Sequence, residues 1–504
     1  MKSRWFNYRP LFLIFSFLSL GSLFAFFVTR NTLTCCLLVI FVSSFLIVLS
    51  ILKKKAKYFF VPFVSFVVGL SAYYISINNF NSAPEMSPTE VTARIYNVSK
   101  PIDGRITAHV DSVEFDGESI DSNMIIYIYD NSGLFEQVEI GREITFAPIN
   151  TYKSDLFFND TPNANMYYKN LKYSATVSYQ NITFGEVDNT LSELIKEKIK
   201  DNFDGVLSNE NIEIAYSSLF GDKAQLFNDQ YASFRLSGVA HLLAVSGLHV
   251  GIIVSIICAI FKFFKKEGWI ELIIVAILAF FYAYICDFSV SVLRACIMAV
   301  CLLFSKRVSR EYDALSSISL AGCILFLVNP LVMFDVSFLM SFSCVLGITL
   351  LFKPIKLALI KAKMPNWLAN GLAMSLATSI SLIFIMAYFF RTLNVISLFA
   401  NIILIPIFTF GFTILFVVSI ISLVFPFLKY LMIVVNPIFD FINLTTAFLG
   451  GLPISNFETV NIQYFALFVY FLLLLILSRI CTAKREYRVI ITLPILAILV
   501  ALMI

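Results

Sequence analysis

The stretch His241-Leu-Leu-Ala-Val-Ser-Gly-Leu-His-Val-Gly251 opens the first long apolar run after a polar region of the chain. It holds two of the three histidines among 504 residues. On an α-helix with about 100° per residue, His241 and His249 lie ~80° apart and Ser246 lies ~60° from His249, so all three share one half of the helix. Gly247 and Gly251 form a small-xxx-small pair, which lets a second helix approach closely. We therefore predict a membrane helix that does more than anchor the chain.

Composition places the chain among membrane proteins. Hydrophobic residues make up 59% of it and charged residues 14%, whereas a soluble domain is roughly a quarter charged. The formal net charge of +4 is unevenly distributed along the chain. Residues 84–236 carry 12 basic and 24 acidic side chains, and the rest of the chain carries 25 basic and 9 acidic ones. The nine cysteines show no CxxC spacing, so we interpret them as small apolar side chains.

Apolar runs long enough to cross a bilayer occur on both sides of the acidic region, because about 20 residues of helix cross a ~30 Å hydrocarbon core. We expect about 13 spans, at approximately 10–29, 33–52, 58–77, 239–261, 269–286, 288–305, 314–329, 333–352, 367–390, 396–425, 430–449, 462–480 and 488–504. Lys and Arg gather in alternate loops, which predicts a cytoplasmic N-terminus and an extracytoplasmic C-terminus. The long run 396–425 contains Pro406, and we expect it to be broken or re-entrant.

Between the third and fourth expected spans the sequence changes to short alternating runs. Val91–Tyr96, Arg105–Val110 and Met124–Tyr129 are examples, and Gly-containing turns separate them. This pattern predicts five or six strands, and about 100 residues suit an OB-like barrel. The expected fold is a polytopic α-helical membrane protein with an extracytoplasmic β-rich, OB-like domain inserted after the third span. The expected domains are N-terminal membrane helices (1–83), the β domain (84–190), an amphipathic helical connector (191–236) and a second, larger set of membrane helices (237–504).

Four blocks resemble, in their order along the chain, those of the ComEC competence family. They are Phe234–Gly251, Ser289–Met298, Asn329–Phe342 and Ser397–Pro406. The second is similar to the family's Ser-Val-Leu-Arg-Ala helix, the third to its Phe-Asp block and the fourth to its Ala-Asn…Ile-Pro block. In the third block Leu339 stands where the family usually has Gln.

The resemblance implies a channel in the bacterial cytoplasmic membrane that moves single-stranded DNA into the cytoplasm during natural transformation. Longer relatives continue into a metallo-β-lactamase-like domain, whose His-x-His-x-Asp-His run is missing here. We therefore expect no enzyme activity, no metal and no cofactor. The implied partners are single-stranded DNA, membrane lipids, a periplasmic or surface DNA receptor, a cytoplasmic helicase or translocase, a separate nuclease and a second copy of the chain.

Arg294 is the most informative charge, because it falls inside an apolar run, where an arginine at the bilayer centre costs roughly 2.5–3.5 kcal/mol on insertion scales. It would either contact a DNA phosphate or form a packing pair with Asp287. His241, Ser246 and His249 have three interpretations: polar contacts between helices, the lining of a hydrated DNA path, or a hydrolytic pair of Ser246 with His249. The Gly-x-Ser-x-Gly elbow that favours such a pair is missing.

Further polar or helix-disrupting positions complete the expected channel core: Gly247, Gly251, Asp335, Asn401 and Pro406. Asp335 lies near the start of a span, where capping a helix is the alternative role. In the β domain, aromatic and basic side chains are candidates to contact single-stranded DNA: Tyr127, Tyr129, Lys153, Lys169 and Lys172. The acidic balance of this domain opposes binding of a polyanion, so a structural or partner-docking module is the alternative.

Two other functions remain compatible with the sequence. One is a secondary transporter of a small or lipidic anion, which inverted symmetry between the halves of 239–504 would favour. The other is a membrane hydrolase that uses Ser246 and His249. The sequence contains no Walker A pattern, so directional movement of DNA would take its energy from a partner.

Overall fold

The computed structural model describes residues 9–28, 57–99, 101, 104–130, 135, 137–158, 161–222, 228–394, 396–452 and 456–458. The chain divides into two compact units. The sheet unit contains Leu13–Asp201 and Gly322–Asp335, and the helical unit contains Asn202–Ala321 and the chain from Val336 onward, together with the residues before Leu13. The expected spans at 33–52, 462–480 and 488–504 lie outside the described residues.

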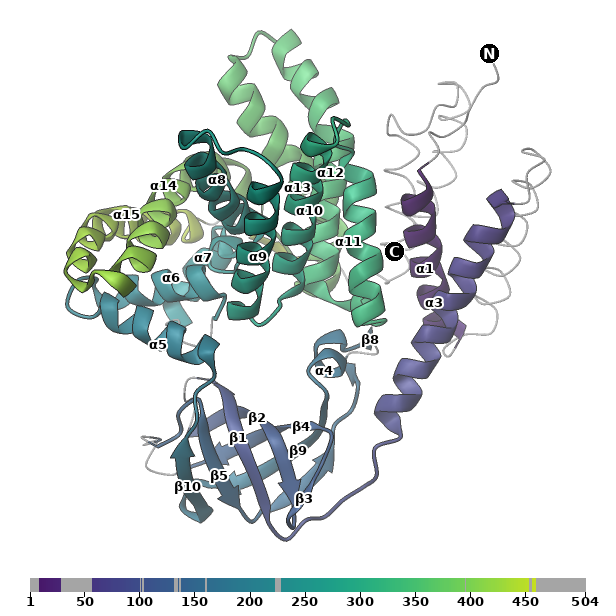
Figure 1. Ribbon diagram of the computed structural model, residues 1–504, viewed down its shortest axis with the longest axis vertical. Helices are drawn as coiled ribbons and strands as arrows, with labels where there is room; N and C mark the ends of the chain where they lie inside the picture. The colour runs from purple at the N-terminus through teal and green to yellow at the C-terminus, as the bar shows by residue number, and fades with distance from the viewer. Residues whose placement is uncertain are drawn as a thin grey trace. The chain divides into compact units, whose positions relative to one another are not determined.

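Most of the described chain is helical (Figure 1). The helices are α1 (Pro10–Val28), α3 (Lys57–Asn81), α4 (Ala164–Tyr168), α5 (Leu191–Phe203), α6 (Asn209–Phe220), α7 (Asn228–Leu236), α8 (Gly247–Phe263), α9 (Trp269–Ile285), α10 (Val290–Arg307), α11 (Ala314–Val328), α12 (Val336–Lys361), α13 (Asn366–Phe389), α14 (Ser397–Val424) and α15 (Val435–Gly450). Short 3-10 turns include η1 (Tyr179–Asn181), η2 (Ala240–Leu242), η3 (Val332–Phe334) and η4 (Pro426–Val434).

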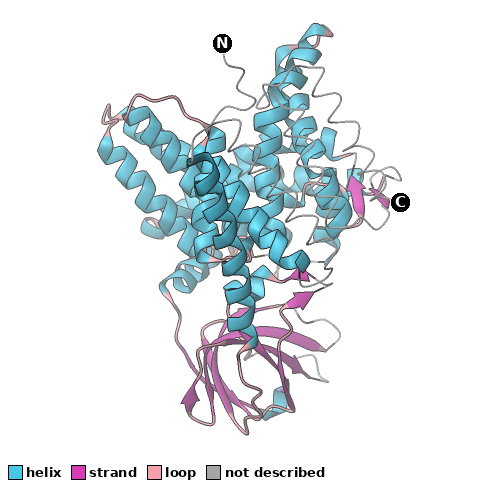
Figure 2. Cartoon of the chain, turned by 90° about the vertical axis from the view of Figure 1, so that its right-hand side faces the viewer, coloured by secondary structure: helices cyan, strands magenta, loops and turns pink. Residues whose placement is uncertain are grey.

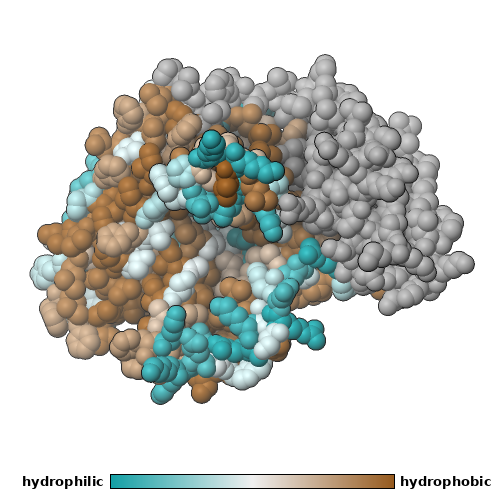
Figure 3. All heavy atoms as spheres, turned by 90° about the horizontal axis from the view of Figure 1, so that it is seen from above, coloured by the Kyte–Doolittle hydropathy of each residue, from teal (hydrophilic) through white to brown (hydrophobic). Residues whose placement is uncertain are grey.

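The helices have the length and composition of membrane spans. In the described residues, Val61–Asn81, Val336–Lys361, Asn366–Phe389, Ser397–Val424 and Pro426–Gly450 are long and apolar enough to cross a bilayer, and α1, α8, α9 and α11 are shorter apolar helices. Large apolar side chains stand exposed along α9, such as Ile270, Ile273 and Ile277, and hydrophobic residues cover much of the coloured surface in Figure 3. So much exposed apolar surface indicates a membrane protein. The number of spans stays a prediction.

The expected break in the run 396–425 is wrong. Helix α14 continues without interruption from Ser397 to Val424, with Pro406 inside it. A proline removes one backbone hydrogen bond, but helices in apolar surroundings tolerate this when neighbouring groups compensate.

The region 191–236, expected to be an amphipathic helical connector, contains α5, α6 and α7. Helix α6 buries nine of its twelve residues inside the helical unit. Its polar side chains find partners: the Asn211 amide donates to Asp440 Oδ1 at 2.7 Å and to Asn436 Oδ1 at 3.1 Å, both on α15. Because these hydrogen bonds satisfy the amide, a polar residue is compatible with complete burial here.

The sheet unit contains strands where the alternating runs predicted them (Figure 2), and burial alternates along β1, β4 and β9. The largest sheet has the order β10-β5-β1-β2-β4-β9-β6, with β3 paired to β2. Its strands are β1 (Val91–Val98), β2 (Arg105–Phe115), β3 (Glu118–Ser119), β4 (Asn123–Tyr129), β5 (Arg142–Phe146), β6 (Asn150–Lys153), β9 (Leu171–Ser178) and β10 (Ile182–Val187). Two further two-stranded sheets pair β7 (Phe157–Phe158) with β8 (Thr161–Pro162), and β11 (Thr392–Asn394) with β12 (Asn456–Glu458), which follows α14 and α15 in the chain.

The sheet curls back on itself. Strands β1, β2 and β4 form an antiparallel meander, and β9 continues it parallel to β4. Strand β5 pairs with β1 on one side of this meander and β6 pairs with β9 on the other. Because β5 and β6 are separated only by residues 147–149, the two sides of the meander must approach each other. Alternate residues such as Met124, Ile126 and Ile128 are then fully buried in the enclosed core.

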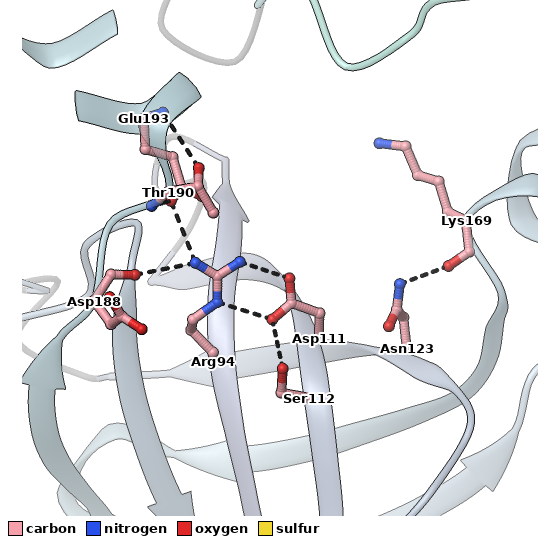
Figure 4. Close-up of polar contacts among 8 residues, drawn as sticks. All are labelled: Arg94, Asp111, Ser112, Asn123, Lys169, Asp188, Thr190 and Glu193. Carbon is pink, nitrogen blue, oxygen red and sulfur yellow. Dashed lines mark hydrogen bonds and ion pairs between the residues drawn. The ribbon is translucent and has the colours of Figure 1, made fainter. Parts of the chain in front are cut away.

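Arg94 ties the sheet to the helix that follows it (Figure 4). Its guanidinium donates to both carboxylate oxygens of Asp111, at 3.0 and 2.8 Å, to the Asp188 carbonyl at 3.0 Å and to Glu193 at 3.3 Å. The hydrogen bond to Asp111 raises the pKa of Arg94, while burial acts in the opposite direction. The bidentate geometry makes this a strong ion pair that fixes the start of α5 on β1 and β2.

The segment before α12 packs within the sheet unit. The Asn329 amide donates to the Ala164 carbonyl at 3.1 Å, and its Oδ1 accepts from the Leu331 N–H at 3.0 Å. The Phe334 ring lies 5.2 Å from Phe26 of α1 and 5.8 Å from Tyr73 of α3, measured between ring centroids. This block of the sequence therefore joins α1, α3 and α4.

Helices α1 and α3 cross at two glycines. A Cβ at Gly21 would lie 2.1 Å from the Phe66 carbonyl oxygen, and a Cβ at Gly69 would lie 2.1 Å from the Leu18 carbonyl oxygen. The two backbones can approach this closely only because both positions lack a side chain.

We expect Gly21→Ala and Gly69→Ala each to lower the melting temperature of the purified chain, because the added methyl forces the helices apart at a cost of roughly 1–3 kcal/mol. Gly251→Ala is the matched control, since a Cβ there would meet no atom within 4 Å. Thermal unfolding in detergent measures all three variants. Equal melting temperatures for Gly69→Ala and Gly251→Ala would contradict the close crossing.

Candidate functional site

Helix α8 begins within the stretch His241–Gly251, and its N-terminus is capped by Ser246. Ser246 has extended backbone angles, and its side chain accepts from the Leu248 N–H at 3.2 Å. The His249 Nδ1 accepts from the Ser246 N–H at 3.1 Å and lies 3.1 Å from the Ser246 Oγ. This is a capping box in which His takes the place of the usual Glu or Gln.

The cap corrects the expected helix over 239–261. Because Ser246 is the N-cap, α8 starts at Gly247, and His241 lies in the separate turn η2. His241 is exposed whereas His249 is buried, so the predicted helix half shared by His241, Ser246 and His249 does not form.

His249 has an apolar environment. Its ring is fully buried and stands edge-on to Phe412, with centroids 4.5 Å apart, and to Phe408 at 5.5 Å, both on α14. In the described residues its Nε2 makes no hydrogen bond. Ser246 and His249 are thus committed to the helix cap and to the contact with α14.

Arg294 of α10 faces the first turn of α8. Its side chain is 7% exposed, and a Cβ on Gly247 would lie 3.1 Å from its Nη2. The structure therefore brings Gly247 and Arg294 together and explains the glycine. Gly251 does not pack in this way, because it is exposed and nothing lies within 4 Å of its Cβ position.

The remaining expected channel positions are dispersed. Asp335 is 5% exposed and directly precedes α12, in the position of an N-cap. Asn401 and Pro406 lie on α14, and the Asn401 Oδ1 is buried without a hydrogen-bond partner among the described residues. No hydrogen bond joins Asn401 Oδ1 to Arg294 in the described structure.

Aromatic and positively charged side chains lie together on the outer face of the β sheet. Arg105 lies 5.5 Å from the Tyr127 ring, and Lys169 lies 5.7 Å from the Tyr96 ring. The Tyr96 ring meets His109 edge-on at 6.0 Å. Tyr96, His109 and Arg105 were not among the residues expected to contact DNA, although their alternating positions in the predicted strands place them on the same face as Tyr127.

The other candidate residues of the β domain have different surroundings. The Lys153 ammonium donates to the carbonyl oxygens of Asn81 and Ala83, so it fixes the link from α3 to the sheet, and its contact with DNA stays a prediction. Tyr129 is 43% exposed. Lys172 contributes to a hollow of about 220 Å³, which is lined by Asn79, Phe80, Tyr167, Tyr168, Asn170, Lys172 and Val328.

Comparison with known proteins identifies similarity over the helical region. The family model of the competence protein matches residues 218–484, more than half of the chain. Recombination protein 2 of Haemophilus influenzae is 25% identical over 227 residues, which cover 42% of this chain and 28% of that relative. ComE operon protein 3 of Bacillus subtilis is 26% identical over 211 residues, which cover 41% and 26%.

An uncharacterized protein of Aquifex aeolicus is 32% identical over 165 residues, which cover 32% of this chain and 37% of that protein. The match therefore spans little more than a quarter of the length of the Haemophilus and Bacillus relatives. No solved structure matches the chain. The matched residues include α8, Arg294 and Asn401, whereas the β sheet precedes them.

Ser246→Ala removes the cap of α8, and we expect it to cost about 1 kcal/mol of stability, measured by thermal unfolding. Ser246→Asn, which also caps helices well, should restore both the melting temperature and the activity of the chain in the cell. A nucleophilic serine would give the opposite pattern, with Ser246→Asn as inactive as Ser246→Ala.

The β domain should lose stability on mild acidification. Burial, with a smaller effect of Lys169, lowers the pKa of His109 to about 4 from 6.5, so the fold favours the neutral ring. The stabilisation is complete above pH 6.5 and is lost as the pH falls toward 4, at a cost of about 2 kcal/mol by pH 5. Hydrogen exchange of β2 and β4 peptides in the full chain, at pH 7 and pH 5 with correction for intrinsic rates, measures this loss. His109→Phe should remove most of the difference, and an unchanged pH dependence in that variant would contradict the assignment.

Proposed function

Because this chain belongs to the competence protein family of ComEC type, we propose that it is the membrane conduit through which single-stranded DNA enters the cytoplasm during natural transformation. The proposal assigns DNA passage to the helical unit, which contains most of the matched residues. DNA carries a charge on every phosphate and therefore needs a hydrated, protein-lined route through the bilayer.

The observation that carries this proposal is a set of buried polar atoms without partners among the described residues. His249 Nε2 on α8, Arg294 Nε on α10 and Asn401 Oδ1 on α14 lie within apolar helices and make no hydrogen bond. Folded proteins satisfy nearly all such atoms, and each exception requires an explanation. Water or a polar substrate inside the helical unit would satisfy these three.

We propose further that the β domain is OB-like and guides the strand. The β1–β2–β4 meander, the parallel β4–β9 pair and the closure through β5 and β6 support this assignment. Barrels of this class bind oligonucleotides on the face of their second and third strands, which correspond to β2 and β4. That face presents Tyr127 with Arg105. Because the region is acidic overall, we expect brief rather than tight binding.

In this proposal the N-terminus is cytoplasmic, and the β domain and C-terminus are extracytoplasmic. A receptor outside would deliver DNA, and a separate nuclease would remove the other strand. A cytoplasmic helicase or translocase would supply the energy. We propose that the chain itself performs no hydrolysis, since the hydroxyl of Ser246 and the ring of His249 are engaged in capping α8.

Import of labelled DNA into the native host tests the function. Deletion of the gene should leave labelled DNA outside the cytoplasm and abolish transformation, and a copy of the wild-type gene should restore both. Undiminished import into the cytosol of the deletion strain would overturn the proposal.

Variants in the restored strain test the sheet face. Tyr127→Ala removes a ring on which a base can stack, an interaction worth ~1–3 kcal/mol, so import should fall about tenfold. Lys169→Gln should weaken DNA binding and reduce its salt dependence. Lys198→Gln is the control, because Lys198 is exposed on α5. Equal import in all three strains would leave the β domain with a structural or docking role.

A further inference from the structure

Arg294 is a buried cation without an opposing charge in the described structure. Its Nη1 lies 3.8 Å from the Met298 sulfur, and its Nε has no hydrogen-bond partner. The ionisable groups near it are the Cys344 thiol and the Tyr312 phenol, not carboxylates. The packing pair with Asp287 does not form, since Asp287 is exposed in the turn before α10 and makes no ion pair with Arg294.

A second positive feature lies at the same place. Arg294 Nη2 points at Gly247, the first residue of the 17-residue helix α8. The N-terminus of a helix carries about half a positive charge, and its first N–H groups have no acceptor within the helix. In the capping box the Ser246 hydroxyl accepts from the N–H groups of Leu248 and His249, so Gly247 is the residue of the first turn whose N–H the cap leaves available to a ligand.

These two features together favour an anion. An arginine side chain stays protonated in proteins, so the charge of Arg294 cannot be relieved by loss of a proton. An anion beside Arg294 and Gly247 would receive hydrogen bonds from the guanidinium and from the Gly247 N–H, a combination that recurs in phosphate sites. The missing side chain at Gly247 allows the anion to approach the backbone.

We propose that Arg294 and the first turn of α8 bind a phosphate group. The occupant is assigned on the basis of the proposed function: it is a backbone phosphodiester of the single strand during its passage. The planar guanidinium matches two phosphate oxygens, whereas a lysine would offer a point charge. The site thus binds one phosphate at a time and does not recognise the base sequence.

Thermal unfolding of the full chain in detergent tests the site, with inorganic phosphate as the probe against chloride at equal ionic strength. Phosphate should raise the melting temperature of the wild type by several degrees and leave that of Arg294→Met unchanged. Arg294→Lys should keep part of the shift, and Gly247→Ala should weaken phosphate binding several-fold. Arg310→Met, which removes an exposed arginine beyond α10, should respond like the wild type.

A purely structural arginine gives other results. The proposal requires that Arg294→Met be at least as stable as the wild type in phosphate-free buffer, because the variant removes an uncompensated buried charge. Lower stability of Arg294→Met in that buffer, no phosphate shift in the wild type, or the same shift in Arg294→Met would each overturn the phosphate site.

Two further probes identify the occupant separately from the site. An oligo-dT strand should reproduce the shift in an Arg294-dependent manner, and a strand with an uncharged methylphosphonate backbone should not. The shift in nanodiscs of phosphatidylcholine should equal that in nanodiscs containing phosphatidylglycerol. A response to phosphatidylglycerol but not to oligo-dT would reject the DNA assignment and identify a lipid headgroup, while the phosphate site itself would stand.

Discussion

A protonated guanidinium enclosed by apolar helices requires an opposing charge or water, and this requirement at Arg294 governs the interpretation of the helical unit. The side chain is nearly buried, and the described residues supply no carboxylate to it. Removing an ion from water costs several kcal/mol unless other interactions compensate. In the proposed function, the charged and hydrated strand would supply this compensation during its passage.

The cap at Ser246 contributes to the same arrangement. By ending the irregular turn at residue 246, the cap places the first residue of α8, Gly247, within the helical unit and beside Arg294. The His249 ring closes the cap on one side and packs against Phe408 and Phe412 on the other. Capping, packing and charge are therefore linked through one short segment, in which His249 takes part in both the cap and the packing.

The sequence predicts the parts of the fold that depend on local pattern. The apolar run 269–286 predicts a helix, which the structure has as α9 (Trp269–Ile285), and the alternation in Met124–Tyr129 predicts a strand, which the structure has as β4. The sequence places the start of α8 too early, because a histidine that closes a capping box looks the same in a sequence as a histidine in the middle of a helix. Burial of α6 was missed because the partner of Asn211 is Asp440, more than two hundred residues away. Gly247 and Gly251 look alike in the sequence, and only the position of Arg294 separates them.

The most direct measurement of the central claim is the structure of the full chain with a single-stranded oligonucleotide bound. We expect density for the strand inside the helical unit, with one phosphate between the Arg294 guanidinium and the backbone of Gly247. A strand that passes elsewhere, or an Arg294 paired with a carboxylate and sealed from water while DNA is bound, would contradict the conduit as described.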